Sequence, residues 1–152
     1  MTSRNDAPFA LSVSECWEYL REAAVGRLAV LVDGHPEIFP INFTVDRGSV
    51  VFRTASGTKL AGALEGGPVA FEVDGHDDRL GSAWSVVLKG TARQLESIEE
   101  VLDSDQLPIF PWQDGDKNHF VRIEPAQTDG RRFMIASSAR RHIVQQRGSR
   151  TE

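Results

Sequence analysis

A run of seven residues, Arg53 to Lys59, combines the side chains that proteins use to hold a phosphate group. Its candidate ligands are Arg53, Thr54, Ser56, Gly57, Thr58 and Lys59. All of them except Gly57 carry a positive charge or a hydroxyl. An arginine can donate to two oxygens at once, a lysine adds a compact charge, and glycine lets a ligand approach the backbone closely. Each charge-assisted hydrogen bond contributes roughly 1.5–3 kcal/mol, so three or four are enough for micromolar binding. The run therefore predicts a site for a phosphate monoester.

This run is expected to leave a strand and enter a helix. The first N–H groups of a helix are unpaired and favour an anion, which suits the same ligand. The alternative interpretation is an ordinary helix start with Lys59 in solvent.

Motifs for several other chemistries are absent from the sequence. The residue five positions before Gly57 is Phe52, so the run is not a Walker A sequence, and no G-x-G-x-x-G, H-E-x-x-H or G-x-S-x-G occurs. The polar residues between positions 74 and 78 include three carboxylates and His76, but their spacing does not bring them together around a metal ion. We expect a polar loop there and no metal site.

The run also belongs to a series of short motifs whose order resembles the pyridoxamine 5′-phosphate oxidase-like superfamily, in particular its small flavin-nucleotide-binding branch. The resemblance covers Leu11 to Phe133. The motifs, in chain order, are Gly26-Arg27-Leu28-Ala29, Gly34-His35-Pro36, Pro40-Ile41-Asn42-Phe43, Phe52-Arg53-Thr54, Gly57-Thr58-Lys59-Leu60, Val69-Ala70-Phe71-Glu72-Val73-Asp74, Trp84-Ser85-Val86 and Gly90-Thr91-Ala92.

This resemblance implies a split β-barrel that dimerises and binds FMN in two symmetric clefts at the interface. It implies that the Arg53–Lys59 run grips the flavin phosphate and that the backbone of Asn42 and Phe43 lies beside the isoalloxazine ring. Trp84 and Ser85 would approach the phosphate or the ribityl chain from the partner subunit. The alternatives are that Phe43 and Trp84 are barrel core and that Asn42 caps a bulge.

The function implied is that of an FMN-binding homodimeric oxidoreductase, moving electrons between a reduced donor and a small organic acceptor. The sequence identifies no catalytic residue, and hydride transfer is the chemistry of the cofactor itself. The C-terminal arginine and histidine set of true pyridoxamine phosphate oxidases is not evident, which argues against vitamin B6 oxidation. Two alternatives remain: a deazaflavin-dependent reductase, and a non-catalytic module that binds flavin or haem.

These residues must be positioned by strands and helices, and the order of the expected elements predicts an α+β fold. We expect an antiparallel split β-barrel of six to seven strands with two or three peripheral helices. The expected strands are Arg27–Val32, Ile38–Val45, Ser49–Thr54, Val69–Val73, Ala83–Leu95, His119–Ile123 and Arg132–Ala136. The expected helices are Val13–Ala24, Lys59–Leu64 and Ser97–Leu107. Ser12 and Glu15 have capping-box spacing, and Gly26 is the expected helix stop.

Turns are expected at Asp33-Gly34 and at positions 46–48, Pro40 indicates an edge strand or a bulge, and Asp74–Ser82 is expected to be a loop. The long strand Ala83–Leu95 should change character at Gly90.

The composition fits a single domain, assigned to residues 1–136, with a basic tail over 137–152. The chain has 152 residues and a net charge of −5. The tail has four arginines and one glutamate, a charge of +3, which leaves −8 on the rest. The acidic charge of residues 1–136 argues against nucleic acid as a partner. No apolar run in the sequence is long enough to span a membrane. Cys16 is the only cysteine, which excludes an internal disulfide, and we expect a buried, inert thiol in a cytoplasmic protein.

Overall fold

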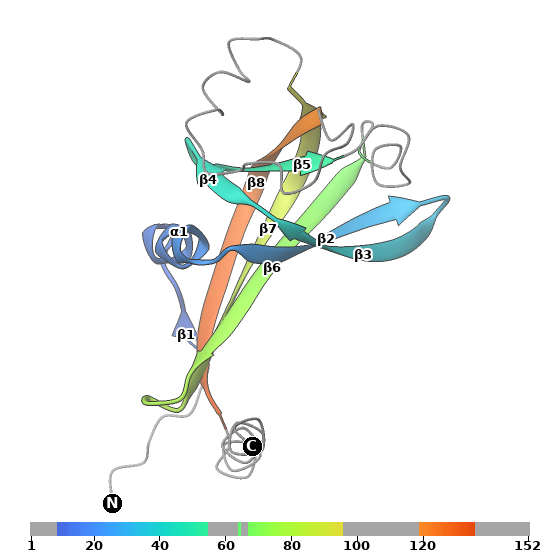
Figure 1. Ribbon diagram of the computed structural model, residues 1–152. Coiled ribbons are helices and arrows are strands. Elements are labelled where there is room, and N and C mark those ends of the chain that lie inside the picture. Colours follow the sequence, from blue (N-terminus) through green and yellow to red (C-terminus); the bar gives the residue numbers. More distant parts are fainter. Residues whose placement is uncertain (1–8, 55–63, 65–66, 96–118, 136–152) are drawn as a thin grey trace, which may run out of the picture.

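The computed structural model describes residues 9–54, 64, 67–95 and 119–135, in which eight strands form one antiparallel sheet with a single helix beside it (Figure 1). The elements are β1 (Phe9–Ala10), α1 (Val13–Glu22), β2 (Val25–Val32), β3 (His35–Asn42), β4 (Thr44–Asp46), β5 (Ser49–Thr54), β6 (Pro68–Asp77), β7 (Ser82–Gln94) and β8 (His119–Met134). The strand order is β3-β2-β6-β7-β8-β5-β4, and β1 pairs with β8 outside this path.

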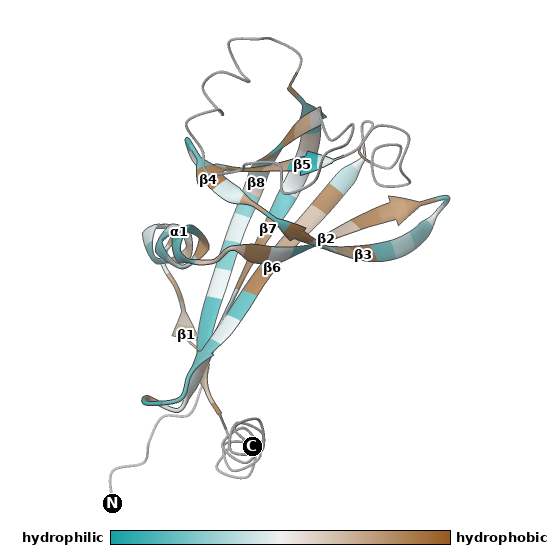
Figure 2. Ribbon diagram, viewed as in Figure 1, coloured by the Kyte–Doolittle hydropathy of each residue, from teal (hydrophilic) through white to brown (hydrophobic). Residues whose placement is uncertain are grey.

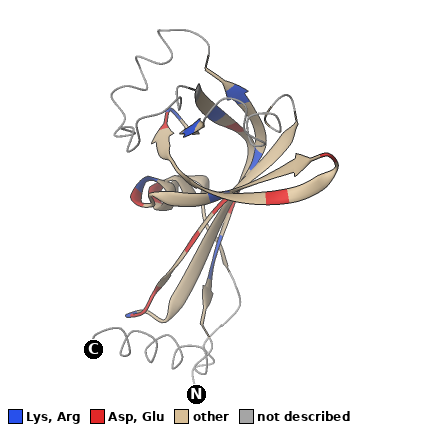
Figure 3. Ribbon diagram, turned by 45° about the vertical axis from the view of Figure 1, so that its right-hand side comes forward, with Lys and Arg blue, Asp and Glu red and all other residues tan. Residues whose placement is uncertain are grey.

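The sheet curls into a barrel, and its three long strands β6, β7 and β8 continue beyond the barrel as an arm (Figure 3). Large apolar side chains fill the barrel, and Leu28, Phe52, Phe71, Leu88 and Ile123 are fully buried. Hydrophobic residues follow the barrel strands, whereas the part of β8 in the arm is mostly polar (Figure 2). The predicted split β-barrel is confirmed.

Helix α1 begins as predicted, with a complete capping box. Ser12 N–H donates to Glu15 Oε1 at 3.0 Å and Glu15 N–H donates to Ser12 Oγ at 3.1 Å. The helix ends at Glu22 rather than Ala24, and the interpretation of Gly26 as its stop is wrong. Gly26 lies in β2, where a Cβ would come within 2.2 Å of the Phe71 ring, so the glycine is required by packing in the sheet.

Both predicted hairpin turns are confirmed by backbone torsions. Asp33 and Gly34 have φ of 50° and 78°, and Arg47 and Gly48 have φ of 49° and 67°. Two successive residues of positive φ match the twist of the flanking strands. Pro40 lies in β3 at one end of the strand order, as expected for a proline that cannot donate to a ladder.

Three larger differences separate the expected strands from the observed ones. The segment expected as one strand, Ile38–Val45, is divided between β3 and β4 at Phe43. The expected loop Asp74–Ser82 is only the turn at residues 78–81, because β6 continues to Asp77 with its polar side chains on the exposed arm. The last two expected strands are one long strand, β8, which accommodates Pro125 opposite Gly90 at a β-bulge. The expected change at Gly90 is confirmed as this bulge, where a Cβ would lie 2.0 Å from the Glu124 carbonyl oxygen.

Cys16 is buried in α1, as predicted, and its thiol lies close to Gly130 of β8. Burial raises the pKa of this thiol, which disfavours the reactive thiolate. The expected helix Ser97–Leu107, most of the expected helix Lys59–Leu64, and the basic tail lie outside the described residues. Within the described ranges, no helix is long and apolar enough to cross a membrane.

Candidate functional site

Strand β5 delivers the first two residues of the predicted phosphate site to the end of the barrel. Arg53 is half-buried, and its guanidinium lies 5.3 Å from the centre of the Phe120 ring, while Thr54 is buried. Their strand partners are Phe120 and His119, the first residues of β8. The other four predicted ligands, Ser56, Gly57, Thr58 and Lys59, lie outside the described residues.

Asn42 and Phe43 lie at the same end of the β4–β5 hairpin as Arg53. They precede Thr44, which pairs with Val51, so chain direction places them beside the residues that follow Val51. Asn42 is exposed. The Phe43 ring packs edge-on against Phe71, with centroids 4.9 Å apart, and its N–H donates to the Ala24 carbonyl at 3.2 Å. The Phe43 side chain is therefore barrel core, and its amide already has an acceptor.

Trp84 and Ser85 lie on β7 in the arm and face opposite sides of the sheet. The Trp84 ring stacks on Tyr19 of α1, with centroids 4.2 Å apart and an interplanar angle of 24°. Tyr19 in turn accepts a hydrogen bond from Arg132, which pairs with Trp84 in the sheet. Ser85 faces away from α1 and lines a cavity of about 730 Å³.

The described members of the two ligand groups, Arg53–Thr54 and Trp84–Ser85, flank opposite ends of β8. Arg53 pairs with Phe120 near its start, and Trp84 pairs with Arg132 near its end. Those partners are twelve residues apart, which at about 3.3 Å per residue is about 40 Å along the strand. In Figure 1, β8 runs from the barrel down into the arm, so one chain does not bring Arg53 and Trp84 together.

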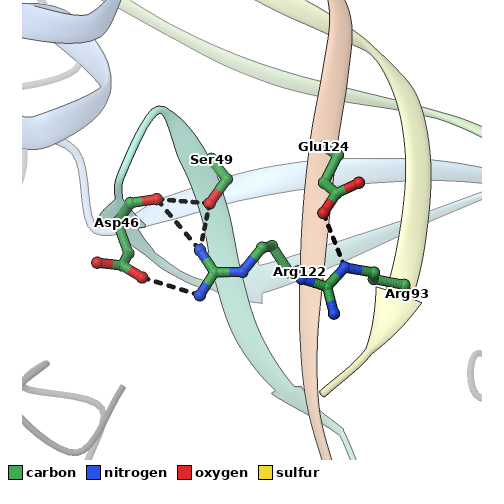
Figure 4. A network of polar contacts seen from close by, with 5 residues as sticks. All are labelled: Asp46, Ser49, Arg93, Arg122 and Glu124. Atoms are coloured by element: carbon green, nitrogen blue, oxygen red, sulfur yellow. Dashed lines mark hydrogen bonds and ion pairs between the residues drawn. The ribbon is translucent and has the colours of Figure 1, made fainter. Parts of the chain in front are cut away.

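A buried ion pair ties the β4–β5 turn to β8 (Figure 4). Arg122 donates to Asp46 Oδ2 at 2.9 Å, to the Asp46 carbonyl at 3.2 Å and to Ser49 Oγ at 2.5 Å. The Arg122 and Asp46 side chains are only 11% and 14% exposed. This turn connects the Asn42–Phe43 corner with Arg53, so Arg122 fixes the strands that present the candidate phosphate ligands.

A charged cluster on the outer face of β2 and β6 was not identified from the sequence. Arg27 Nη1 donates to Glu72 Oε2 and to Asp74 Oδ2, each at 3.0 Å. The sequence feature that could have revealed this cluster is the alternate spacing of Glu72 and Asp74, because alternate residues of a strand lie on one face. Burial first, and then the neighbouring Asp74 carboxylate, raise the pKa of Glu72 above its ordinary value of 4.5, against the opposing effect of Arg27.

This raised pKa predicts a pH dependence of stability. The folded state binds the Glu72 proton more tightly than the unfolded chain, so the associated stabilisation is present below pH 4.5 and is lost as the pH rises through the raised pKa. Glu72→Gln should remove this fall in the free energy of unfolding, measured by urea denaturation across a pH series. An identical pH profile for both proteins would contradict the assignment.

Known proteins of similar sequence identify the family of this chain. The family described as pyridoxamine 5′-phosphate oxidase matches residues 12–132. The chain belongs to this pyridoxamine 5′-phosphate oxidase family.

Solved structures of similar proteins have the same fold. An FAD-binding protein from Mycobacterium smegmatis is 40% identical with a TM-score of 0.73, over 83% of this chain and 98% of that one. A conserved protein of unknown function from Corynebacterium diphtheriae is 36% identical with a TM-score of 0.73, over 85% and 100%. An FAD-binding protein from Mesorhizobium loti is 26% identical with a TM-score of 0.65, over 82% and 97%. This member of the pyridoxamine 5′-phosphate oxidase family thus shares its fold with two proteins that are named as FAD-binding.

Proposed function

We propose that the protein is a homodimeric flavin-dependent oxidoreductase that moves electrons between a reduced donor and a small organic acceptor. Two of the similar solved proteins are named as FAD-binding, which supports a flavin here. A bound flavin supplies the electron and hydride chemistry, and the residues of this chain bind and orient it. Arg53 and Thr54 suit its phosphate, since one brings a half-buried cation and the other a hydroxyl.

The observation that carries the proposal of a dimer is the separation of the two ligand groups along β8. The family resemblance puts both groups next to the same phosphate or ribityl chain. Because Arg53 and Trp84 flank opposite ends of β8 within one chain, a second copy must bring its Trp84–Ser85 segment to the Arg53 end of the first. Each flavin would then be held between two subunits.

An exposed apolar face offers a surface for the second copy. Val25, Leu31 and Ile38 on β2 and β3 are each more than half exposed. Leu31 also lines an apolar groove of about 330 Å³, together with Ala29, Pro36 and Ala70. Burying this face would stabilise a dimer by the hydrophobic effect, and the incomplete site supports a second copy as the occupant.

The flavin that we propose is FMN or FAD, and the names of the similar proteins make FAD the first to test. The experiment is to purify the protein, release any bound ligand with acid, and titrate the stripped protein with each flavin while measuring its molar mass by light scattering. We expect a dimer that binds one flavin per chain. A colourless protein that takes up neither FMN nor FAD would contradict the proposal.

A further inference from the structure

We propose that the cavity on the arm binds an adenosine monophosphate unit, the second half of FAD, and thereby selects FAD over FMN. This inference rests on the proposed function, because the flavin half must be bound for its attached nucleotide to reach the arm. It assigns the cavity of about 730 Å³ that lies on the face of β6, β7 and β8 opposite α1.

The shape of this cavity follows from residue size across three paired strands. The central strand β7 presents only small side chains here, Ser85 and Ala83. Asp74 and His76 flank them on β6, and Arg131 and Phe133 flank them on β8. Strands lie about 4.8 Å apart, so the two walls stand about 10 Å from each other across a shallow floor. The volume lies within the range of roughly 300–1,000 Å³ that is typical of small-molecule sites.

The first row of the cavity has the chemistry for a phosphate and a ribose. Asp74, Ser85 and Arg131 are register partners across the three strands. The exposed Arg131 guanidinium can donate to phosphate oxygens, and the Ser85 hydroxyl lies on the floor beside it. The Asp74 carboxylate is held by Arg27 on the opposite wall, where it can accept from ribose hydroxyls and stays one strand away from the phosphate.

The second row has the chemistry for a flat base. His76, Ala83 and Phe133 are partners in the next register row, about 7 Å further along the strands. The Phe133 side chain is 37% exposed, and the methyl group of Ala83 leaves room for a ring to lie between Phe133 and the imidazole. Stacking on an aromatic side chain stabilises a bound base. Met134 and Ile135 complete the apolar end of the cavity.

The order of the two rows also suits a nucleotide that is attached to a flavin. Ser85 belongs to the pair that approaches the flavin phosphate in the proposed dimer. A group bonded to that phosphate would therefore enter the cavity at the Asp74–Ser85–Arg131 row and extend toward Phe133. FMN ends at its phosphate and would leave the second row empty.

The test compares the affinities of the stripped protein for FAD and FMN by fluorescence quenching. We expect FAD to bind at least about tenfold more tightly than FMN. Phe133→Ala and Arg131→Ala should reduce that ratio to near one and leave FMN affinity within about twofold. Ala83→Phe, which fills the floor, should do the same, and Arg93→Ala, another exposed arginine, is the matched control and should preserve the ratio.

Each other outcome is decisive. Equal affinities of the native protein for FAD and FMN would overturn the inference and leave the proposed function intact. A loss of both affinities in Phe133→Ala, with folding verified by circular dichroism, would also overturn it, because the residue would not distinguish the nucleotide half. Binding of neither flavin by the native protein would refute the proposed function together with this inference.

Discussion

A protein that carries both Arg53→Glu and Lys59→Glu is expected to lose flavin affinity by at least about 100-fold. Two charge-assisted hydrogen bonds contribute roughly 3 kcal/mol or more together, which corresponds to a factor of more than 100 in the dissociation constant. The two new carboxylates would also repel the flavin phosphate. Arg53 is already positioned at the end of β5, so the change removes a ligand that the fold presents.

The control for this variant reverses the same number of charges elsewhere. Arg21 and Arg79 are exposed, on α1 and in the β6–β7 turn, so Arg21→Glu with Arg79→Glu changes the net charge equally. This control should bind flavin within about threefold of the native protein in the same fluorescence titration. Retained affinity in the Arg53 and Lys59 variant would show that the phosphate lies elsewhere.

The largest expected effect on stability is that of Asp46→Ala, which should lower the free energy of unfolding by about 3–5 kcal/mol. The substitution leaves the Arg122 guanidinium buried with its carboxylate partner removed, and an uncompensated buried charge is costly. Urea denaturation followed by circular dichroism measures the change.

Glu124→Ala is the matched control, because Glu124 is also paired with an arginine. Arg93 Nε donates to Glu124 Oε1 at 2.7 Å. Both side chains of that pair are about half exposed, and exposed pairs contribute roughly 0–1 kcal/mol. Similar losses in Asp46→Ala and Glu124→Ala would contradict the importance assigned to burial of the Arg122 pair.

Local signals in the sequence were sufficient for the parts of the fold that local chemistry determines. Ser12 and Glu15 marked the start of α1, and the glycines at 34 and 48 marked tight turns, because each requirement is met within a few residues. The order of short motifs identified the family without any long-range information. The candidate phosphate ligands at Arg53 and Thr54 were found in the same way.

The extent of the arm could not be read locally. Pro125 and Gly130 interrupt β8 in the sequence, and polar residues after Val73 suggested a loop, but pairing with β7 carries all of them in strands. The cavity on the arm is likewise a product of pairing, since Ala83 becomes its floor only because larger residues of β6 and β8 flank it. The separation of Arg53 from Ser85 emerges from the same long strands.

The most direct test of a flavin site shared by two subunits is a mixed dimer. One chain carries Arg53→Glu and Lys59→Glu, the other carries Ser85→Glu, and two different affinity tags isolate the heterodimer. Each variant alone should bind no flavin. In the heterodimer, one site combines both defects and the other combines the intact Arg53 end of one chain with the intact Ser85 of its partner. The account predicts one flavin per heterodimer, and a heterodimer that binds none would contradict it.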